Sequence, residues 1–143
     1  MTAAEELTHD ARALRMATFR LARRLRAERA VDTMTDGQFA VLIALVNDGP
    51  HTLSELADRE RITPPSMNRT VNCLEESGYL ARTQDADDRR KVNISITDEG
   101  AEIVAETVRR RAAWLESVLQ ELTPDDRRVL ARAAVLMEEA ATR

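Results

Sequence analysis

The 143 residues of this chain suffice for one domain with a buried core, and the net charge of −4 argues against binding nucleic acid through overall charge alone. An aromatic content of 3% argues against a stacking platform for single-stranded bases, and the single cysteine excludes an internal disulfide. No segment has the pattern of a signal peptide or a membrane span, so we expect a cytoplasmic protein without a membrane partner.

The first predicted element is a long amphipathic helix over residues 4–29. Its apolar residues recur at steps of three and four, which places them on one face, and Thr18 stands where the series would continue. A second helix follows Thr35-Asp-Gly-Gln38, which has the spacing of a capping box, and Asn47-Asp-Gly-Pro50 ends it. The apolar positions of the first helix are Leu7, Ala11, Leu14, Leu21 and Leu25.

Two short helices separated by a tight turn come next. Thr52-Leu-Ser-Glu55 also has capping-box spacing and opens a helix that ends near Arg61. Thr63 is the expected N-cap of the following helix, with Pro64 at the first helical position, where a missing N–H costs nothing. Ser77-Gly78 ends this helix. Its predicted buried stripe consists of Met67, Val71 and Leu74.

A β-hairpin with a charged tip is predicted after these helices. Residues 79–83 suit a first strand, and residues 92–96 alternate apolar and polar side chains at the period of a half-buried strand. Thr97 is the expected N-cap of the next helix. Such a charged run is often only a solvated turn, but its place after a capped helix favours a wing with a shaped tip. The tip residues are Asp85, Asp87, Asp88, Arg89, Arg90 and Lys91.

Two further helices complete the chain. The first runs from about Gly100 to Leu122, and its apolar residues alternate at steps of four and three, as in a seam between helices. Thr123-Pro-Asp-Asp126 opens the last helix. The terminal helices together carry more apolar surface than a compact core of this length needs.

The order of elements predicts a mainly α-helical fold with a small β-hairpin, a winged helix-turn-helix flanked by long terminal helices. In such a unit the second short helix enters the major groove and the first supports it. The outer face of the second short helix is polar, which is usual for any solvent-exposed helix. The hairpin that directly follows this helix favours DNA contact instead. The groups on this helix that suit bases or phosphates are Thr63, Pro65, Ser66, Asn68, Arg69 and Asn72.

Residues 35–100 resemble the MarR family, the winged-helix regulators of multiple antibiotic resistance. Leu74-Glu-Glu-Ser-Gly-Tyr-Leu80 is similar to the exit of the family's recognition helix, and Thr52-Leu-Ser-Glu-Leu-Ala57 resembles its bracing helix. In the family, Asp-Arg-Arg at the hairpin tip precedes an alternating strand that ends in Thr and Gly. This chain is similar, with Asp88-Arg89-Arg90 at the tip, Ile94 and Ile96 in the strand, and then Thr97 and Gly100.

The resemblance implies a homodimer in which residues 34–100 bind DNA and residues 1–33 and 101–143 form a helical dimerisation region. It implies that Arg89 lies in the minor groove, while Asp88 and Arg90 pair to hold the loop and face the backbone. Pro64-Pro65 departs from the family pattern and removes two N–H donors from the first turn. The expected dimer residues are Leu7, Ala11, Leu14, Leu115, Leu119, Leu122, Leu130 and Met137.

A small aromatic or phenolic acid that releases DNA is also implied, in a cleft between the dimer helices and the winged region. The candidate residues are Arg20, Arg24 and Phe39, because arginine can bind a carboxylate. The alternative, which we favour, is that both arginines are solvated and Phe39 belongs to the core. Cys73 is expected to be a small semi-buried core residue rather than a redox sensor. We expect no metal and no cofactor, since no ligand spacing is visible.

The leading prediction is therefore a homodimeric, sequence-specific regulator of transcription, more often a repressor, that binds a pseudo-palindromic operator in double-stranded DNA. A helical dimeric scaffold for protein interactions, without DNA contact, is the second prediction, favoured by the acidic balance and the seam-like terminal helices. An enzyme is not expected, because the sequence shows no nucleophile–base pair, glycine-rich phosphate loop or metal motif.

Overall fold

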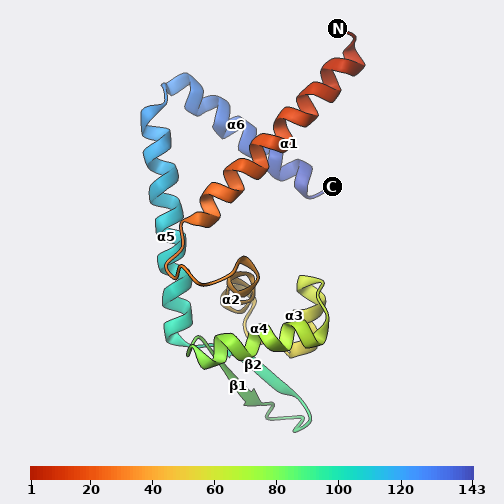
Figure 1. Ribbon diagram of the computed structural model, residues 1–143, viewed down its shortest axis with the longest axis vertical. Coiled ribbons are helices and arrows are strands. Elements are labelled where there is room, and N and C mark those ends of the chain that lie inside the picture. Colours follow the sequence, from red (N-terminus) through yellow and green to blue (C-terminus); the bar gives the residue numbers. More distant parts are fainter. The chain divides into compact units, whose positions relative to one another are not determined.

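The computed structural model describes residues 1–143 as helices joined to one antiparallel hairpin (Figure 1). The mainly helical winged helix-turn-helix fold that the sequence predicts is confirmed. The elements in chain order are α1 (Ala3–Ala27), α2 (Asp36–Asp48), α3 (Leu53–Glu60), α4 (Pro64–Glu76), β1 (Leu80–Gln84), β2 (Val92–Ile96), α5 (Asp98–Glu121) and α6 (Pro124–Ala141).

Threonine caps fix where the helices begin, as the sequence predicts. At Thr35 both bonds of the capping box form, with Gln38 N donating to Thr35 Oγ1 and Thr35 N donating to Gln38 Oε1. At Thr52 only the first bond of the predicted box is present, from Glu55 N. The starts of α4, α5 and α6 are capped through the side chains of Thr63, Thr97 and Thr123.

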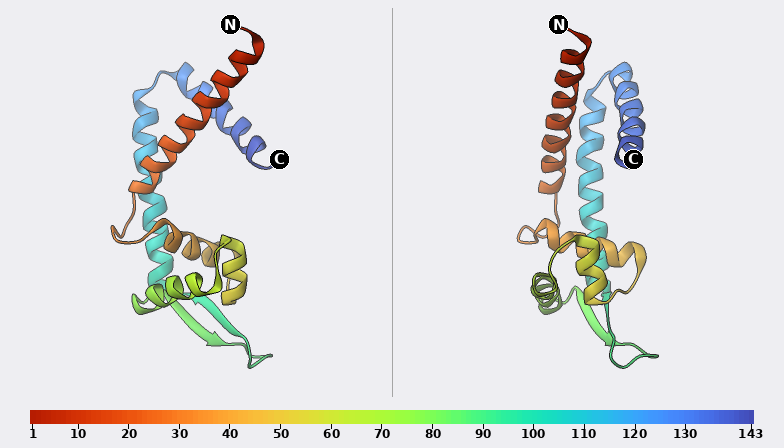
Figure 2. Two further views of the ribbon diagram at one scale, coloured as in Figure 1. Left: turned by 45° about the vertical axis from the view of Figure 1, so that its right-hand side comes forward. Right: turned by 90° about the vertical axis from the view of Figure 1, so that its right-hand side faces the viewer.

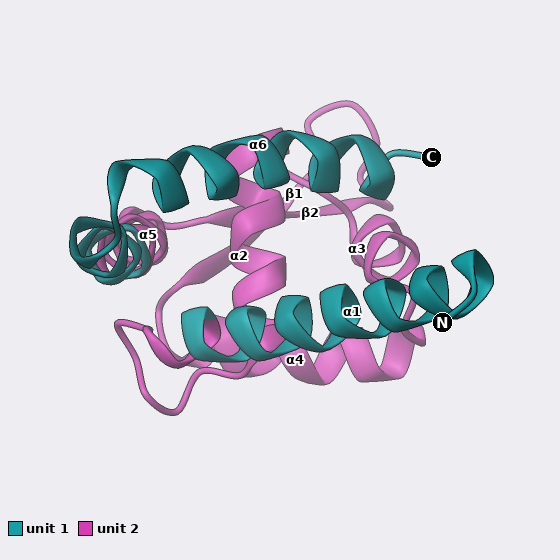
Figure 3. Ribbon diagram, turned by 90° about the horizontal axis from the view of Figure 1, so that it is seen from above, with its two compact units in different colours: residues 1–25, 111–143 teal, residues 26–110 magenta.

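The chain divides into two compact units, coloured separately in Figure 3. Met1–Leu25 and Arg111–Arg143 form unit 1, and Arg26–Arg110 forms unit 2. The hydrophobic core belongs to unit 2, where α2, α3, α4 and the hairpin pack together. Its most deeply buried side chains are Val41, Leu42, Leu56, Met67, Val71, Leu74 and Ile94.

The hairpin of unit 2 is held in register by its own ladder and by a short third segment. Leu80 pairs with Ile96 and Gln84 with Val92, so β1 begins one position later than the strand predicted from residue 79. His51 adds a bridge to β2, since His51 N donates to Ile94 O at 3.0 Å and Ile94 N donates to His51 O at 2.7 Å. Beyond these contacts the hairpin tip extends past the helices of unit 2 (Figure 2).

Gly100 allows the first turn of α5 to lie directly on the base of the hairpin. A Cβ at this position would lie 2.8 Å from Ile96 Cγ1 and would overlap the carbonyl oxygen of Tyr79. Thr97 strengthens the same junction because its hydroxyl donates to Gly78 O at 2.6 Å while accepting from Gly100 N. The Thr-Gly ending of the second strand is therefore a packing requirement as well as a helix cap.

Unit 1 consists of α1, the last part of α5 and α6, and neither α1 nor α6 contains a buried residue. Leu14 is 54% exposed and Phe19 63% exposed, although both are large and apolar. No helix in the chain combines the length and the apolar content needed to cross a bilayer. An apolar groove of about 350 Å³ separates α1 from α6 and is lined by Ala11, Leu14, Arg15, Thr18, Phe19, Met137 and Ala140.

Candidate nucleic-acid interface

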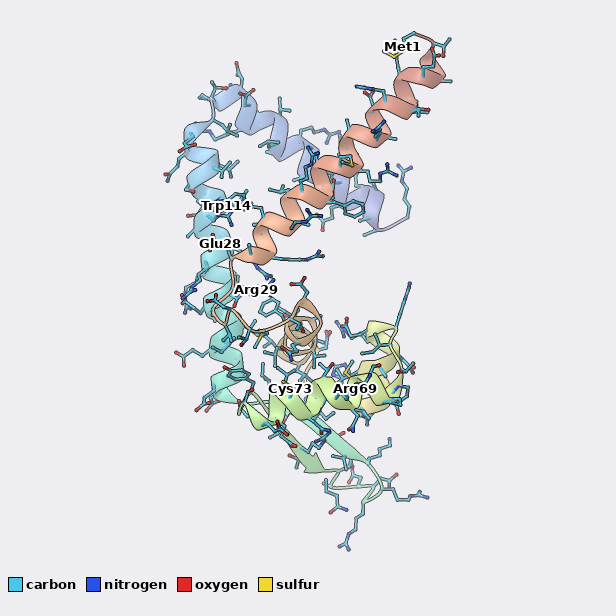
Figure 4. All side chains as sticks on the ribbon, viewed as in Figure 1. Met1, Glu28, Arg29, Arg69, Cys73 and Trp114 are labelled. Atoms are coloured by element: carbon cyan, nitrogen blue, oxygen red, sulfur yellow. The ribbon has the colours of Figure 1, made fainter.

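The outer face of α4 is polar and accessible, while its inner face is buried. Met67 and Val71 are completely buried, and Pro65, Asn68 and Arg69 on the other side are exposed. Figure 4 shows Arg69 on α4, toward the N-terminal end relative to Cys73. Of the other α4 residues that the sequence suggested, Ser66 and Asn72 are half-buried. The structure thus brings the predicted groups together on one helix of unit 2.

A chain of hydrogen bonds orders the first turn of α4. Thr63 Oγ1 donates to Ser66 Oγ at 3.0 Å and accepts from Ser66 N at 3.4 Å. Arg69 Nη2 donates to the same Ser66 Oγ at 3.1 Å. Since Ser66 Oγ accepts both bonds, its own O–H is left to donate to an external acceptor such as a phosphate oxygen. The N–H donors missing at Pro64 and Pro65 are partly replaced by these side chains.

Arg82, which the sequence did not single out, joins the hairpin to α4. Its Nη1 forms an ion pair with Glu75 Oε1 at 2.8 Å, and its Nη2 donates to Asn68 Oδ1 at 3.0 Å. Arg82 lies opposite Ile94 in the ladder, so both side chains are on the face of the hairpin that packs on the helices. The only available signal was an arginine early in a short strand, and such a signal does not identify a partner on another element.

The loop at the tip of the hairpin is organised by Asp85. Its Oδ1 accepts from Asp87 N at 2.8 Å and Asp88 N at 3.1 Å, and its Oδ2 accepts from Asn93 Nδ2 at 2.9 Å. These bonds, the one from Asn93 foremost, lower the pKa of the Asp85 carboxyl below its ordinary value of 3.8. Asp85 was included in the tip only for its charge, and no sequence pattern indicated this role.

Asp88 and Arg90 also approach one another, as the resemblance implies. Asp88 Oδ1 accepts from Arg90 N at 3.0 Å and more distantly from Arg90 Nε at 3.4 Å. The side chain of Arg90 is nevertheless 93% exposed, so this contact restrains it little. Arg89 and Lys91 are exposed as well, and the side chain of Arg89 has no hydrogen-bond or ion-pair partner. The tip therefore presents exposed cations on a loop that an aspartate holds from within.

The residues suggested for an effector lie in different units. Arg20 and Arg24 belong to unit 1, where the guanidinium of Arg24 lies 4.4 Å from the centroid of the Trp114 ring. Trp114 (labelled in Figure 4) was not among the predicted residues, because a cation–π pair between separate helices has no local signature. Phe39 belongs to unit 2 and packs against its hydrophobic core.

The expectation for Cys73 is wrong. Its side chain is exposed rather than semi-buried, and Sγ accepts a hydrogen bond from Gln38 Nε2 at 3.3 Å. The buried stripe of α4 takes Met67, Val71 and Leu74, and the position next to Leu74 is turned away from the core. No group of three or more metal-ligating side chains is present in the chain.

Comparison with known proteins identifies relatives along nearly the whole chain. Residues 34–92 match the model of the MarR family. An uncharacterised HTH-type transcriptional regulator of Mycobacterium leprae is 38% identical over 88% of this chain and 88% of its own length. The HTH-type transcriptional repressor MdtR of Bacillus subtilis is 31% identical over 76% of this chain and 70% of its own length.

Solved structures share the fold at lower identity. A MarR family protein from Bacillus stearothermophilus superposes with a TM-score of 0.81 over 100% of both chains at 22% identity. A Staphylococcus aureus MepR variant bound to an oligodeoxyribonucleotide superposes with a TM-score of 0.69, covering 92% of this chain and 96% of that chain at 19% identity. At these identities the likeness concerns the fold.

Proposed function

Since the chain belongs to the MarR family and is a transcriptional regulator, we propose that it is a homodimeric repressor that binds a pseudo-palindromic operator in double-stranded DNA. The observation that carries this proposal is the combination in unit 2 of an exposed polar face on α4 with an extended hairpin whose tip cations are exposed. A helix of this kind fits the major groove, and a hairpin tip of this kind reaches the phosphate backbone or the minor groove. The repressor MdtR and the DNA-bound MepR variant support it as relatives in sequence and in fold.

We assign the DNA contacts by the chemistry of each group. On α4, Asn68, Arg69 and Asn72 can bond base edges. On the wing, Arg89 enters the minor groove, the paired Asp88 and Arg90 face the backbone, and Lys91 adds a phosphate contact. In the first turn of α4, Ser66 donates to a phosphate oxygen, with Thr63 and Pro65 beside it.

The dimer is proposed to form through residues 1–33 and 101–143, which leaves residues 34–100 to bind DNA. Exposed apolar side chains on α1 and α6, with the groove that separates these helices, provide a surface that a second copy would cover. A twofold axis would then present two α4 helices to half-sites about one helical turn apart. The residues assigned to this contact remain Leu7, Ala11, Leu14, Leu115, Leu119, Leu122, Leu130 and Met137.

Release by a small aromatic or phenolic acid is the secondary part of the proposal. It rests on the family resemblance, which implies Arg20 and Arg24 as partners for a carboxylate and Phe39 as a further candidate residue. A regulator that acts on chromosomal DNA would work in the cytoplasm.

Gel-shift titration with the DNA upstream of its own gene tests the proposed function. Retardation at low salt that weakens steeply as salt rises would support it, because phosphate contacts displace counterions. The absence of retardation at low salt would favour the alternative of a helical interaction scaffold without DNA contact.

A further inference from the structure

The contact between Arg82 and Asn68 limits what Asn68 can offer to DNA. Arg82 Nη2 lies 3.0 Å from Asn68 Oδ1, and its Nη1 is held by Glu75 at 2.8 Å. Arginine has donors only, so the atom of the amide that faces it has to be the oxygen. The amide nitrogen of Asn68 is then the end left for other partners, and it has none within the protein.

Arg82 is itself fixed in place by the hairpin. Its partner in the β-ladder is Ile94, which is 1% exposed in the hydrophobic core. The side chain of Arg82 is 28% exposed and that of Glu75 39% exposed, so the ion pair lies at the junction of β1 and α4 rather than in open solvent. A backbone anchored by the core and an ion pair on the guanidinium both restrict the direction from which Asn68 Oδ1 is approached.

We propose that Arg82 is a specificity-determining residue that acts through Asn68, holding its oxygen so that the amide N–H groups face DNA and disfavour cytosine at the contacted base. This inference rests on the proposed function, because it requires α4 in the major groove. Arg82 is a positioning residue in this scheme and need not touch a base.

The chemistry of the base edges gives the inference its direction. In the major groove guanine offers N7 and O6, adenine offers N7, and thymine offers O4, all of which accept from an N–H donor. Cytosine offers only the N4 amino group, which is itself a donor. An asparagine that can rotate its amide could accept from cytosine through Oδ1, but one whose Oδ1 is held by Arg82 meets cytosine with donor against donor.

Selection from a library of random DNA duplexes tests the inference. The full-length protein and the variants Asn68→Ala, Arg82→Met, Arg82→Lys and the double variant Asn68→Ala/Arg82→Met each select bound duplexes, and base frequencies are read at every position. Asn68→Ala identifies the base that Asn68 reads, as the position where a preference disappears. Arg59→Met is the matched control, because it also breaks one surface ion pair, with Asp48, on helices other than α4.

Among duplexes selected by the wild-type protein, the frequency of cytosine at the position that Asn68 reads should be about tenfold lower in each half-site. This is the scale of one mismatched base pair. Arg82→Met should remove the cytosine depletion at that position and change no other position. Arg82→Lys should keep the depletion, because lysine also has donors only. The control Arg59→Met should keep it as well. In the Asn68→Ala background, Arg82→Met should change the profile no further. A general loss of affinity in Arg82→Met would not by itself produce this pattern, and melting curves confirm that each variant is folded.

The inference would be overturned if cytosine stayed depleted in Arg82→Met, or if Arg82→Met changed the base frequencies at another position. It would also be overturned if Arg82→Met still changed the base frequencies in the Asn68→Ala background. A base profile that Asn68→Ala leaves unchanged would overturn it too. These outcomes leave the proposed function intact, since the wild type still selects a site. If the wild type selects no sequence at all, the proposed function fails first.

Discussion

Asp85 and Asn93 close the loop at the tip of the wing, where Asn93 Nδ2 donates to Asp85 Oδ2 at 2.9 Å. The other oxygen of the same carboxylate accepts from the amides of Asp87 and Asp88. One side chain therefore fixes both the path of the loop and the strand that follows it. The direction in which Arg89 and Arg90 extend depends on this arrangement.

Asp85→Ala should weaken DNA binding several-fold on all sequences while changing the melting temperature little, because the loop is exposed and distant from the core. Amide hydrogen exchange at Asp87 and Asp88 should become faster. Asp87→Ala is the control, since its side chain holds no loop amide. Equal DNA affinities for the two variants would show that the wing does not need its internal aspartate.

The ionisation of Asp85 provides a second, independent prediction. A pKa that is lowered in the folded state means that folding favours the carboxylate form of Asp85. The contribution of this carboxylate to stability is therefore present above pH 3.8 and is lost as the pH falls through the lowered pKa. An NMR titration of the carboxyl carbon should therefore place the midpoint below 3.8. In Asn93→Ala, which removes the largest cause of the shift, the midpoint should rise toward 3.8. A midpoint that does not respond to Asn93→Ala would contradict the proposed role of Asp85 in the loop.

Gly100→Ala should destabilise the fold by about 1–3 kcal/mol, the usual cost of overpacking, since its Cβ would overlap Tyr79 O and press on Ile96. Gly37→Ala is the matched control in a helix of the same unit, where the added methyl would meet only Thr35 Oγ1 at 3.9 Å. Chemical denaturation of both variants makes the comparison. Equal free energies of unfolding would mean that the junction of α5 and the hairpin is looser than described.

The dimer prediction can be checked with one residue of the apolar groove. Leu14→Asp should shift the protein toward monomer in analytical ultracentrifugation and reduce operator binding in parallel, because a charge would be buried in the contact. Val46→Asp serves as the control, since Val46 is 43% exposed but lies on α2 in unit 2. A dimer that persists in Leu14→Asp would place the contact elsewhere.

Local features of the fold could be predicted from the sequence because each depends on neighbouring residues. Thr35, Thr63 and Thr123 cap helices through bonds to residues three positions ahead, and alternation over residues 92–96 predicts the strand. The buried stripe of α4 follows from helical spacing in the same way. The error at Cys73 has a local cause, since residue type suggested burial whereas helical phase determined exposure.

Two contacts of candidate residues could not be predicted because they join side chains on different elements. Arg82 reaches Asn68 across 14 positions, and Arg24 reaches Trp114 from another helix. Both depend on how elements pack and on rotamers, which no spacing rule contains. The sequence could therefore supply the groups on α4 and at the wing tip, but not the partners that orient them.

The wing cations allow a test of how DNA is held. Replacing both Arg89 and Arg90 by Ala should weaken binding to specific and random duplexes alike. It should also reduce the slope of log affinity against log salt by about 1–2, at roughly 0.9 for each phosphate that the protein no longer neutralises. Arg69→Ala should instead change which bases are preferred. An unchanged salt slope in the double variant would remove the wing from the interface.

Footprinting of the wild-type protein on the DNA upstream of its own gene tests the central claim most directly. We expect two protected half-sites of related, inverted sequence, with centres about one helical turn apart. Protection should weaken as salt rises and should disappear in the Arg89→Ala/Arg90→Ala variant. A protein that stays dimeric yet protects no site at low salt would contradict the proposed function and leave the interaction scaffold as the better description.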